Sequence, residues 1–297
     1  MLTTAHARPA PLPWLATLIA LIVGVVPFLI SLAVQHGFSA MSEGARAIAY
    51  ASAVGSLVFR AGVAFLVAQW HGERHGQLAF RRPAIVLALF GVLLLCWQGV
   101  QIGAASLMVR LAMTGGSMRI MLAASSVLYP LLHALGTWLA WIIAVRILRQ
   151  EALPWPSFNA RWRAAGLAAW TLASVLAMLA PATVAMINTL GIDGYALALA
   201  SYAGAAVIPI MLAFAGAWLG LPRYLAGIHG WRLLGASIGA LVCGGWLAYR
   251  GFDLLGSLPL DALLSVVVTI GASLLLCLGA YWVWTFALYT GLRRGAP

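Results

Sequence analysis

The residue whose chemistry most needs an explanation is Arg60, which stands in the apolar stretch VGSLVFRAGVAFLV at residues 54–67. It precedes Trp70 by ten residues, which is about 15 Å along an α-helix, so we expect it near the middle of a membrane-spanning helix. Placing an arginine there costs from about 3 to more than 10 kcal/mol. Such a residue is a functional-site candidate, and the alternative is a structural arginine whose charged end snorkels to the interface.

Carboxylates, the usual partners of a buried arginine, are absent from every long apolar stretch. The six acidic residues all fall in predicted loops: Glu43, Glu73, Glu151, Asp193, Asp253 and Asp261. Four kinds of partner remain open for Arg60: backbone carbonyls freed at a kink, water in a cavity, a lipid or substrate anion, and another subunit. The same absence argues against proton- or sodium-coupled transport, which commonly uses intramembrane Asp or Glu.

Polar side chains in two other apolar stretches share helix faces. One face carries Ser126, Tyr129, His133 and Thr137 at spacings of three and four residues, beside a helix-kinking Pro130. The preceding stretch carries Gln98 and Gln101, and buried amides need hydrogen-bond partners.

One hypothesis joins these side chains in a ligand or anion site made of Arg60, Gln98, Gln101, Tyr129 and His133. The alternative, favoured for the polar side chains taken alone, is ordinary hydrogen bonding between membrane helices.

The segment WHGERHG at residues 70–76 makes His71 and His75 weak metal candidates, because they are four residues apart with Glu73 between them. Its glycines predict an interfacial basic loop rather than the rigid helix of an HExxH zinc site, so no metal is expected. No cofactor is expected either, since His133 is the sole histidine deep in an apolar stretch and bis-histidine haem ligation needs two.

Enzymatic motifs are missing from the sequence. The three cysteines form no CxxC or metal-type spacing, and we expect them to pack as small apolar side chains. No nucleophile elbow with a suitable histidine, P-loop or dinucleotide fingerprint is present. The sequence therefore predicts a non-enzymatic protein without catalytic residues.

The elements that must position these residues are membrane helices. Hydrophobic residues make up 64% of the 297-residue chain and charged residues 8%, and the mean hydropathy is +1.00, whereas soluble domains are roughly 25% charged. A bilayer core is crossed by about 20 apolar helical residues. We therefore predict an all-α polytopic bundle, a single integral membrane domain over residues 1–297, with eight spans at about 14–35, 47–70, 83–109, 120–145, 164–188, 195–219, 232–249 and 262–289.

The arginines are concentrated in alternate loops of the chain. Four lie in the odd-numbered loops (Arg46, Arg110, Arg119 and Arg250), and the others, apart from Arg60, lie in the even-numbered loops and the two ends. By the positive-inside rule both ends are cytoplasmic, which predicts a multi-pass protein of the bacterial inner membrane. This topology accounts for the formal net charge of +11, so nucleic acid is not an expected partner. The expected partner is membrane lipid, and other membrane subunits remain open.

Two segments resemble bacterial members of the Yip1 family of polytopic membrane proteins. They are LHALGTWLAWIIAVRIL at residues 132–148 and PSFNARWRAAGLAAWTLASVLAMLAP at residues 156–181, with FALYTGLRRG at 286–295 similar to the end of some members. The resemblance covers about a third of the chain and departs from the family in span number, eight rather than five. It implies a non-enzymatic role in membrane organisation and carries over no catalytic residues.

Two functions follow from the sequence. The first is a non-catalytic scaffold or accessory subunit of a membrane process, favoured by the lack of intramembrane acids. The alternative is a permease or channel-like protein for a small anion or lipid-linked solute, with Arg60 as the counter-charge.

Overall fold

The structure is a computed structural model that describes residues 12–34, 43–75, 80, 82–113, 118–148, 159–189, 195–256 and 262–293. Its eight α-helices are α1 (Leu12–Val34), α2 (Glu43–His75), α3 (Pro83–Met113), α4 (Met118–Leu148), α5 (Arg161–Thr189), α6 (Tyr195–Gly220), α7 (Gly230–Gly256) and α8 (Ala262–Arg293). The predicted all-α fold is confirmed. Each predicted span falls on one of these helices, although α2, α3, α7 and α8 extend four to seven residues beyond the predicted C-terminal ends.

Seven of the helices contain segments long and apolar enough to cross a membrane: Tyr50–His75, Pro83–Ala104, Pro130–Leu148, Arg161–Pro181, Leu199–Gly220, Gly230–Gly251 and Val267–Leu292. The described apolar segment of α1, Leu12–Val26, is shorter. The chain is thus an integral, multi-pass membrane protein.

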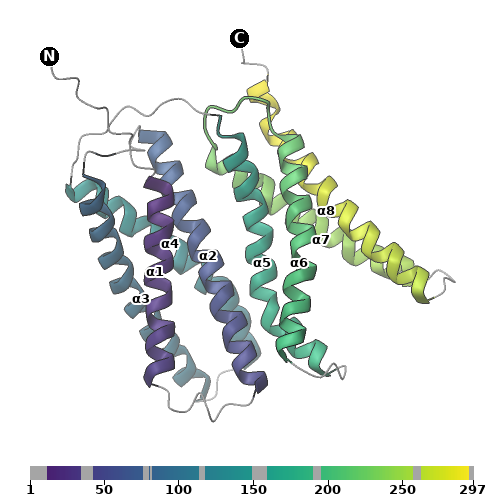
Figure 1. The fold of residues 1–297 in the computed structure, drawn as a ribbon, viewed down its shortest axis with the longest axis horizontal. Helices are drawn as coiled ribbons and strands as arrows, with labels where there is room; N and C mark the ends of the chain where they lie inside the picture. The colour runs from purple at the N-terminus through teal and green to yellow at the C-terminus, as the bar shows by residue number, and fades with distance from the viewer. Residues whose placement is uncertain are drawn as a thin grey trace. The chain divides into compact units, whose positions relative to one another are not determined.

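The chain, expected from its sequence to form one membrane domain, divides into two compact units. Unit 1 comprises Met1–Gln35 and Phe59–Pro156, and unit 2 comprises His36–Val58 and Ser157–Pro297. Helix α2 therefore contributes its first part to unit 2 and the rest to unit 1. Within unit 1, α3 packs against α1 and α4; within unit 2, α6 and α7 each pack against both α5 and α8 (Figure 1).

The end of α2 corrects one expectation. The glycines of WHGERHG predict a loop, yet the helix continues through this segment to His75. Gly72 is buried, and the fully buried Gln69 donates a 2.7 Å hydrogen bond from its amide to the Glu73 carboxylate one turn later. Packing and this hydrogen bond outweigh the low helix propensity of glycine, which is about 1 kcal/mol.

Close packing in unit 2 depends on glycines that face α8. Gly216 and Gly220 of α6 lie where an added Cβ would overlap the backbone of α8. Gly239 of α7 lies against the ring of Trp284, and Gly235 lies one turn earlier beside the same helix. Both pairs have the GxxxG spacing that lets membrane helices approach closely. The motif at Gly235 and Gly239 therefore serves packing inside unit 2.

The first part of α2 packs on α5 through a carbonyl that a proline leaves without its helical donor. Pro181 lacks an N–H, so the carbonyl of Ala177 loses its hydrogen bond within α5. Gly55 lies against this carbonyl, and a Cβ at residue 55 would come within 2.7 Å of it. One turn away, the Trp170 indole donates a 2.7 Å hydrogen bond to the Val58 carbonyl. The carbonyl that Pro181 leaves without its helical donor thus contributes to helix packing.

Asn159 forms hydrogen bonds that join the connection between α6 and α7 to the start of α5. Its Oδ1 accepts hydrogen bonds from the backbone N–H groups of Arg161 and Leu225, both at 3.1 Å. Its Nδ2 donates to the Arg223 carbonyl at 2.7 Å. Asparagine at this position caps the first turn of α5, and the same side chain fixes the fold of the α6–α7 connection.

His229 ends that connection in a conformation that is uncommon for a residue with a side chain. Its φ is 48°, in the left-handed region where Asn, Asp and His are enriched. Its carbonyl accepts hydrogen bonds from the N–H groups of Arg232 at 2.8 Å and Leu233 at 3.2 Å, which begins α7. Its ring meets the buried Tyr289 edge to face, with centroids 6.4 Å apart.

We expect His229→Asn to remove a small pH dependence of stability while preserving the fold. Partial burial and, next, the charge of Arg232 lower the pKa of His229 below its ordinary value. Because the folded state favours neutral histidine, this contribution is present above about pH 6.5 and is lost as the pH falls through the lowered folded pKa. Asparagine tolerates the positive φ and does not titrate.

Thermal unfolding of both proteins in detergent at about pH 7.5 and about pH 5 measures the effect. The wild type should lose more stability on acidification than His229→Asn, and His229→Gly should behave like the asparagine variant. Equal losses in all three proteins would contradict this role of His229.

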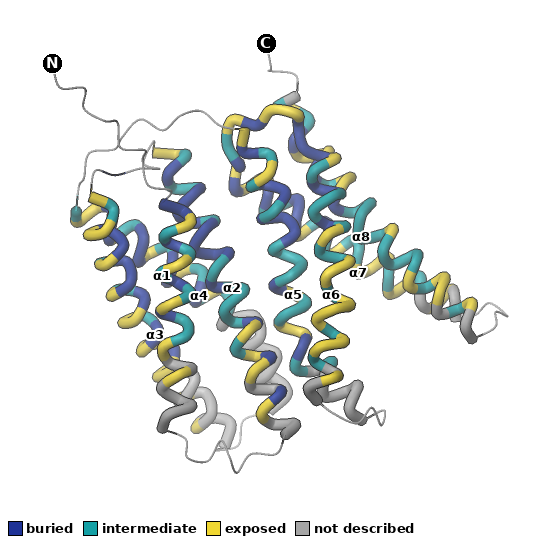
Figure 2. The backbone as a smooth tube through the Cα atoms, in the orientation of Figure 1, coloured by how far each residue is buried: buried dark blue, intermediate teal, exposed yellow. Residues whose placement is uncertain are grey.

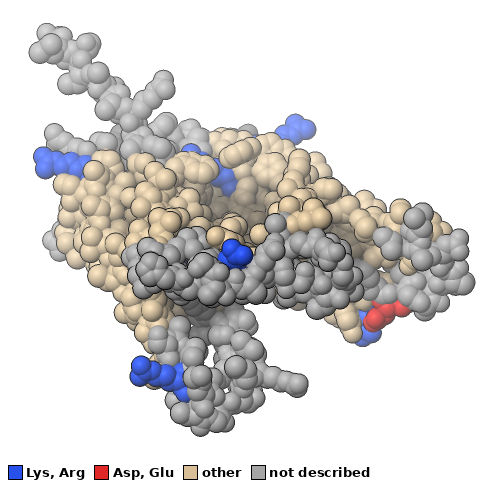
Figure 3. Space-filling view, turned by 60° about the horizontal axis from the view of Figure 1, so that its bottom comes forward, with Lys and Arg blue, Asp and Glu red and all other residues tan. Residues whose placement is uncertain are grey.

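The outer surface of the described helices is mainly apolar. In unit 2 Tyr289 of α8 is fully buried, whereas Trp246 and Leu254 of α7 and Leu275 of α8 are exposed. Figure 2 shows exposed and intermediate residues along much of α7 and α8. The described charged side chains on the face in Figure 3 are few and scattered among uncharged residues. Apolar side chains on the outside are what a membrane environment requires.

Candidate functional site

Arg60 lies inside unit 1, within the apolar segment Tyr50–His75 of α2. Its side chain is only 7% exposed, so it is buried among protein atoms and does not snorkel along the outside of the helix. Glu73 lies thirteen residues further along the same continuous helix, or about 20 Å away, so this carboxylate is too distant to neutralise the guanidinium.

The side chain of Gln98, on α3, meets the guanidinium of Arg60 directly. In the orientation that satisfies both ends of the Gln98 amide, its oxygen accepts hydrogen bonds from Arg60 at 2.6 Å (Nη1) and 3.3 Å (Nη2). The Gln98 nitrogen then donates to the Val23 carbonyl of α1 at 3.1 Å. The hydrogen bonds to the guanidinium are charge-assisted, the stronger kind, and the amide links α1, α2 and α3.

Gln101 and His133 form a second polar contact beside the first. The Gln101 amide faces Nδ1 of His133, with its nitrogen at 3.4 Å and its oxygen at 3.5 Å. Both side chains are buried. When the amide nitrogen donates, Nδ1 is the acceptor and Nε2 carries the proton of the neutral ring. Thr137, one turn along α4, donates a 2.8 Å hydrogen bond to the His133 carbonyl.

Trp97 joins α3 to α4 at the same level. Its indole N–H donates a 3.1 Å hydrogen bond to the Leu132 carbonyl. Gly136 makes room for the ring, because a Cβ at residue 136 would overlap the indole. This contact fixes the distance between the helix that carries the two glutamines and the helix that carries His133.

These side chains surround a cavity inside unit 1, which we call the Arg60 cavity. It is lined by Ala20, Val23, Arg60, Leu94, Trp97, Gln98, Gln101, His133 and Thr137. Its free space holds about one water molecule. These nine described residues include one cation and no carboxylate.

The structure brings together four of the five residues expected in the site: Arg60, Gln98, Gln101 and His133. The side chains of Tyr129 and Ser126 lie outside the described residues. Thr137 lines the cavity as its place on the His133 face suggested. Sequence reasoning missed Trp97 and the contribution of α1, whose Val23 takes part through a carbonyl that every residue possesses.

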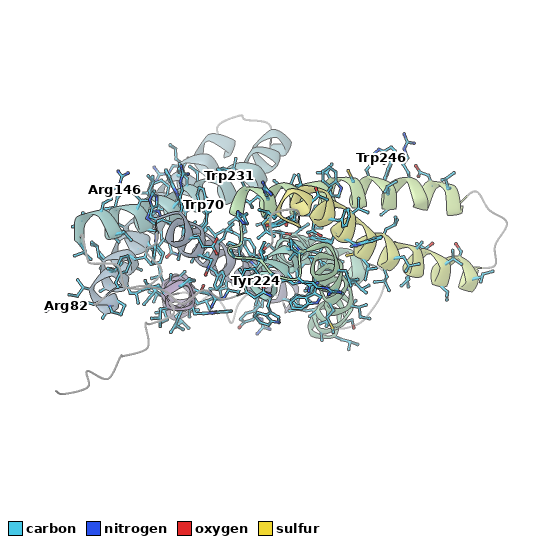
Figure 4. All side chains as sticks on the ribbon, turned by 90° about the horizontal axis from the view of Figure 1, so that it is seen from above. Trp70, Arg82, Arg146, Tyr224, Trp231 and Trp246 are labelled. Atoms are coloured by element: carbon cyan, nitrogen blue, oxygen red, sulfur yellow. The ribbon has the colours of Figure 1, made fainter. Side chains whose placement is uncertain are left out.

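His71 and His75 do lie side by side on helical α2, with ring centroids 4.5 Å apart. Arg74 and Arg146 lie close enough to His71 for their positive charges to repel a cation there. Figure 4 labels Arg146 in unit 1. Two histidines beside arginines are a poor cation site, and no group of three potential metal ligands occurs among the described residues. The three cysteines are free thiols; Cys96 is exposed, and Cys277 donates to the Pro209 carbonyl at 3.4 Å.

Comparisons with protein-family models, curated proteins and solved structures find no match to this chain.

Proposed function

We propose that this chain is a non-enzymatic permease or channel-like protein for a small anion, with Arg60 as the counter-charge of the transported ion. Its membrane is the bacterial inner membrane, with both chain ends cytoplasmic. Membrane lipid surrounds the protein, and transport requires no cofactor.

The observation that carries the proposal is a buried cation in a cavity lined by polar side chains. Arg60, Gln98 and His133 converge from three helices on one space, and this space contains a formal positive charge at membrane depth. A charge at that depth is expensive unless it is compensated. Arg60 makes its hydrogen bonds to the Gln98 oxygen beside this space, and an anion that enters the cavity would be attracted to the guanidinium.

The test is anion flux from liposomes containing the purified protein, measured with an ion-selective electrode. Wild-type protein should release chloride faster than empty liposomes. Arg60→Met should reduce the rate at least about tenfold, because the ion then faces an uncompensated transfer into low dielectric, while Arg60→Lys should keep part of it. Arg146→Met is the matched control, since Arg146 is an exposed arginine of the same unit.

A protein that is folded and monodisperse in detergent but gives no flux above empty liposomes would overturn the permease proposal. Equal loss of flux in Arg60→Met and Arg146→Met would count against a specific role for Arg60.

A second candidate, a scaffold or accessory membrane subunit, is favoured by one observation. The cavity is small, and the Gln98 amide already occupies two N–H groups of the Arg60 guanidinium, as a purely structural cross-link would. The resemblance of residues 132–148 and 156–181 to bacterial Yip1-family proteins is in keeping with this role. Under it, Arg60→Met changes stability or association with other subunits and no anion flux exists.

A further inference from the structure

We propose that one end of unit 2 binds the headgroups of anionic phospholipids. This surface, which we call the arginine-rich end, comprises the start of α5, the connection between α6 and α7, the start of α7 and the end of α8. It belongs to a different unit from the Arg60 cavity, so lipid binding there is independent of the proposed anion flux.

The elements of the arginine-rich end meet at one end of unit 2 (Figure 1), where hydrogen bonds join them. The Arg161 guanidinium of α5 donates a 3.1 Å hydrogen bond from Nε to the Trp218 carbonyl in the last turn of α6. The Tyr289 hydroxyl of α8 donates to the Ile228 carbonyl of the α6–α7 connection at 2.5 Å. Asn159 joins the same connection to the start of α5. The protein itself therefore fixes the geometry of this end.

The connection between α6 and α7 has a buried apolar side and an exposed side. Leu221, Leu225 and Ile228 are at most 2% exposed, whereas Arg223 and Tyr224 between them are exposed. The three apolar side chains pack into unit 2, which leaves the arginine and the tyrosine on the surface.

The charges of unit 2 are separated between its two ends. The sequence places six arginines in or directly beside the elements of the arginine-rich end: Arg161, Arg163, Arg223, Arg232, Arg293 and Arg294. It places no acidic residue there. The acidic residues of unit 2 belong to the opposite ends of its helices or to the connections there: Glu43, Asp193, Asp253 and Asp261. A surface with this charge is complementary to anionic lipid.

Exposed aromatic side chains accompany these arginines. Trp162 is 59% exposed, Tyr224 55% and Trp231 70%, and the last two are labelled in Figure 4. Tryptophan and tyrosine favour the headgroup level of a membrane, where one part of the ring is in apolar surroundings and the other in polar ones.

The membrane-spanning segments of unit 2 indicate the same depth. Those of α5, α6, α7 and α8 each have one end at this surface, at Arg161, Gly220, Gly230 and Leu292. The surface therefore lies where the hydrocarbon core gives way to the lipid phosphates.

Arg223 and Arg232 are the exposed arginines of the connection and of the start of α7. The carbonyl of Arg223 accepts the 2.7 Å hydrogen bond from Asn159, which holds its backbone in place. Nη1 of Arg232 lies 3.9 Å from the position of a Cβ at Gly291, so this guanidinium reaches the end of α8. A guanidinium can donate two parallel N–H groups to one phosphate.

The headgroup that these groups select carries a net negative charge. Phosphatidylglycerol offers a phosphate without a compensating cation. In phosphatidylcholine the quaternary ammonium balances the phosphate and is repelled by arginines, so we expect it to bind more weakly.

The experiment measures which lipid the purified full chain retains from an equimolar mixture of phosphatidylglycerol and phosphatidylcholine in detergent. Mass spectrometry of the bound lipid should show at least about tenfold more phosphatidylglycerol with the wild type. Arg223→Gln/Arg232→Gln should lower this ratio at least about fivefold, because each arginine near an anionic surface contributes about that factor. Both residues are exposed, so the variant should fold as the wild type does.

Arg46→Gln/Arg250→Gln is the matched control, since both arginines are exposed residues of unit 2 outside the arginine-rich end. It removes the same charge and should keep the wild-type ratio. Arg60→Met, which concerns the proposed anion flux, should also keep it.

A second measurement distinguishes lipid from free phosphate. Phosphatidylglycerol in the micelles should raise the unfolding temperature of the wild type more than phosphatidylcholine does, because a ligand of the folded state stabilises it. Inorganic phosphate at the same concentration should give no such increase, and Arg223→Gln/Arg232→Gln should respond less to phosphatidylglycerol.

Three results would overturn the proposal. They are equal retention of the two lipids by the wild type, an equal fall of the ratio in the control pair, and stabilisation by inorganic phosphate as large as that by phosphatidylglycerol.

Discussion

Replacing Gln98 with leucine is expected to destabilise the protein by about 2–4 kcal/mol. Arg60→Met should cost no more than about 1–2 kcal/mol, and the double variant should lie within about 1 kcal/mol of the wild type. The two single variants differ because only Gln98→Leu leaves the charged guanidinium of Arg60 in the protein interior. Without Gln98, the guanidinium keeps its charge and loses the oxygen that accepts from Nη1 and Nη2. Without Arg60, what remains is a neutral amide that still donates to the Val23 carbonyl.

The double variant Arg60→Met/Gln98→Leu replaces both members of a buried polar pair with apolar side chains. Such replacements are often neutral, whereas removal of one partner alone is strongly destabilising. The free energies of unfolding of the four proteins in mixed detergent micelles form a double-mutant cycle, which isolates the coupling between the two side chains. Additive effects would contradict the pairing of Arg60 with Gln98.

The same cycle bears on function, because it predicts that Arg60→Met folds. A stable Arg60→Met protein that has lost anion flux separates the role of the charge in transport from its role in folding. A variant that merely unfolds would leave the scaffold and permease hypotheses equally able to explain the loss, which is why Arg60→Lys accompanies it.

The helices could be predicted from the sequence because a membrane requires long apolar segments, and these are visible in composition alone. The exception was the end of α2, where the sequence predicted a loop at Gly72. Glycine propensity is a local property, whereas the burial of Gln69 and its hydrogen bond to Glu73 depend on the folded helix. The low helix propensity of glycine therefore predicted the wrong structure at Gly72, where burial and hydrogen bonding favour the helix.

Part of the candidate site could also be predicted. Arg60, Gln98, Gln101 and His133 stand out because polar groups in apolar helices must find partners. Which partners they find depends on how the helices pack, and no spacing in the sequence encodes the contact between Arg60 and Gln98. The role of Val23 was inaccessible for a simpler reason, since its contribution is a backbone carbonyl.

The contact between Trp97 and Gly136 could not be predicted from the sequence either, because the two residues are far apart in the chain. A substitution at Gly136 should therefore have a large effect on stability. Gly136→Ala is expected to destabilise the protein by about 2–4 kcal/mol. The added methyl group would overlap the Trp97 indole, so the ring must move and its hydrogen bond to the Leu132 carbonyl is lost. The sign is opposite to the usual effect of this substitution, since alanine inside a helix is favoured over glycine by about 1 kcal/mol.

Gly103→Ala is the matched control, because Gly103 lies inside α3 and a Cβ there meets no atom within 4 Å. It should leave stability unchanged or raise it. In a Trp97→Leu background the clash partner is gone, so Gly136→Ala should there cost less than about 1 kcal/mol. Unfolding temperatures in detergent measure all of these variants. Stabilisation by Gly136→Ala equal to that by Gly103→Ala would mean that Trp97 does not pack on Gly136, and the position of Trp97 in the wall of the Arg60 cavity would lose its physical basis.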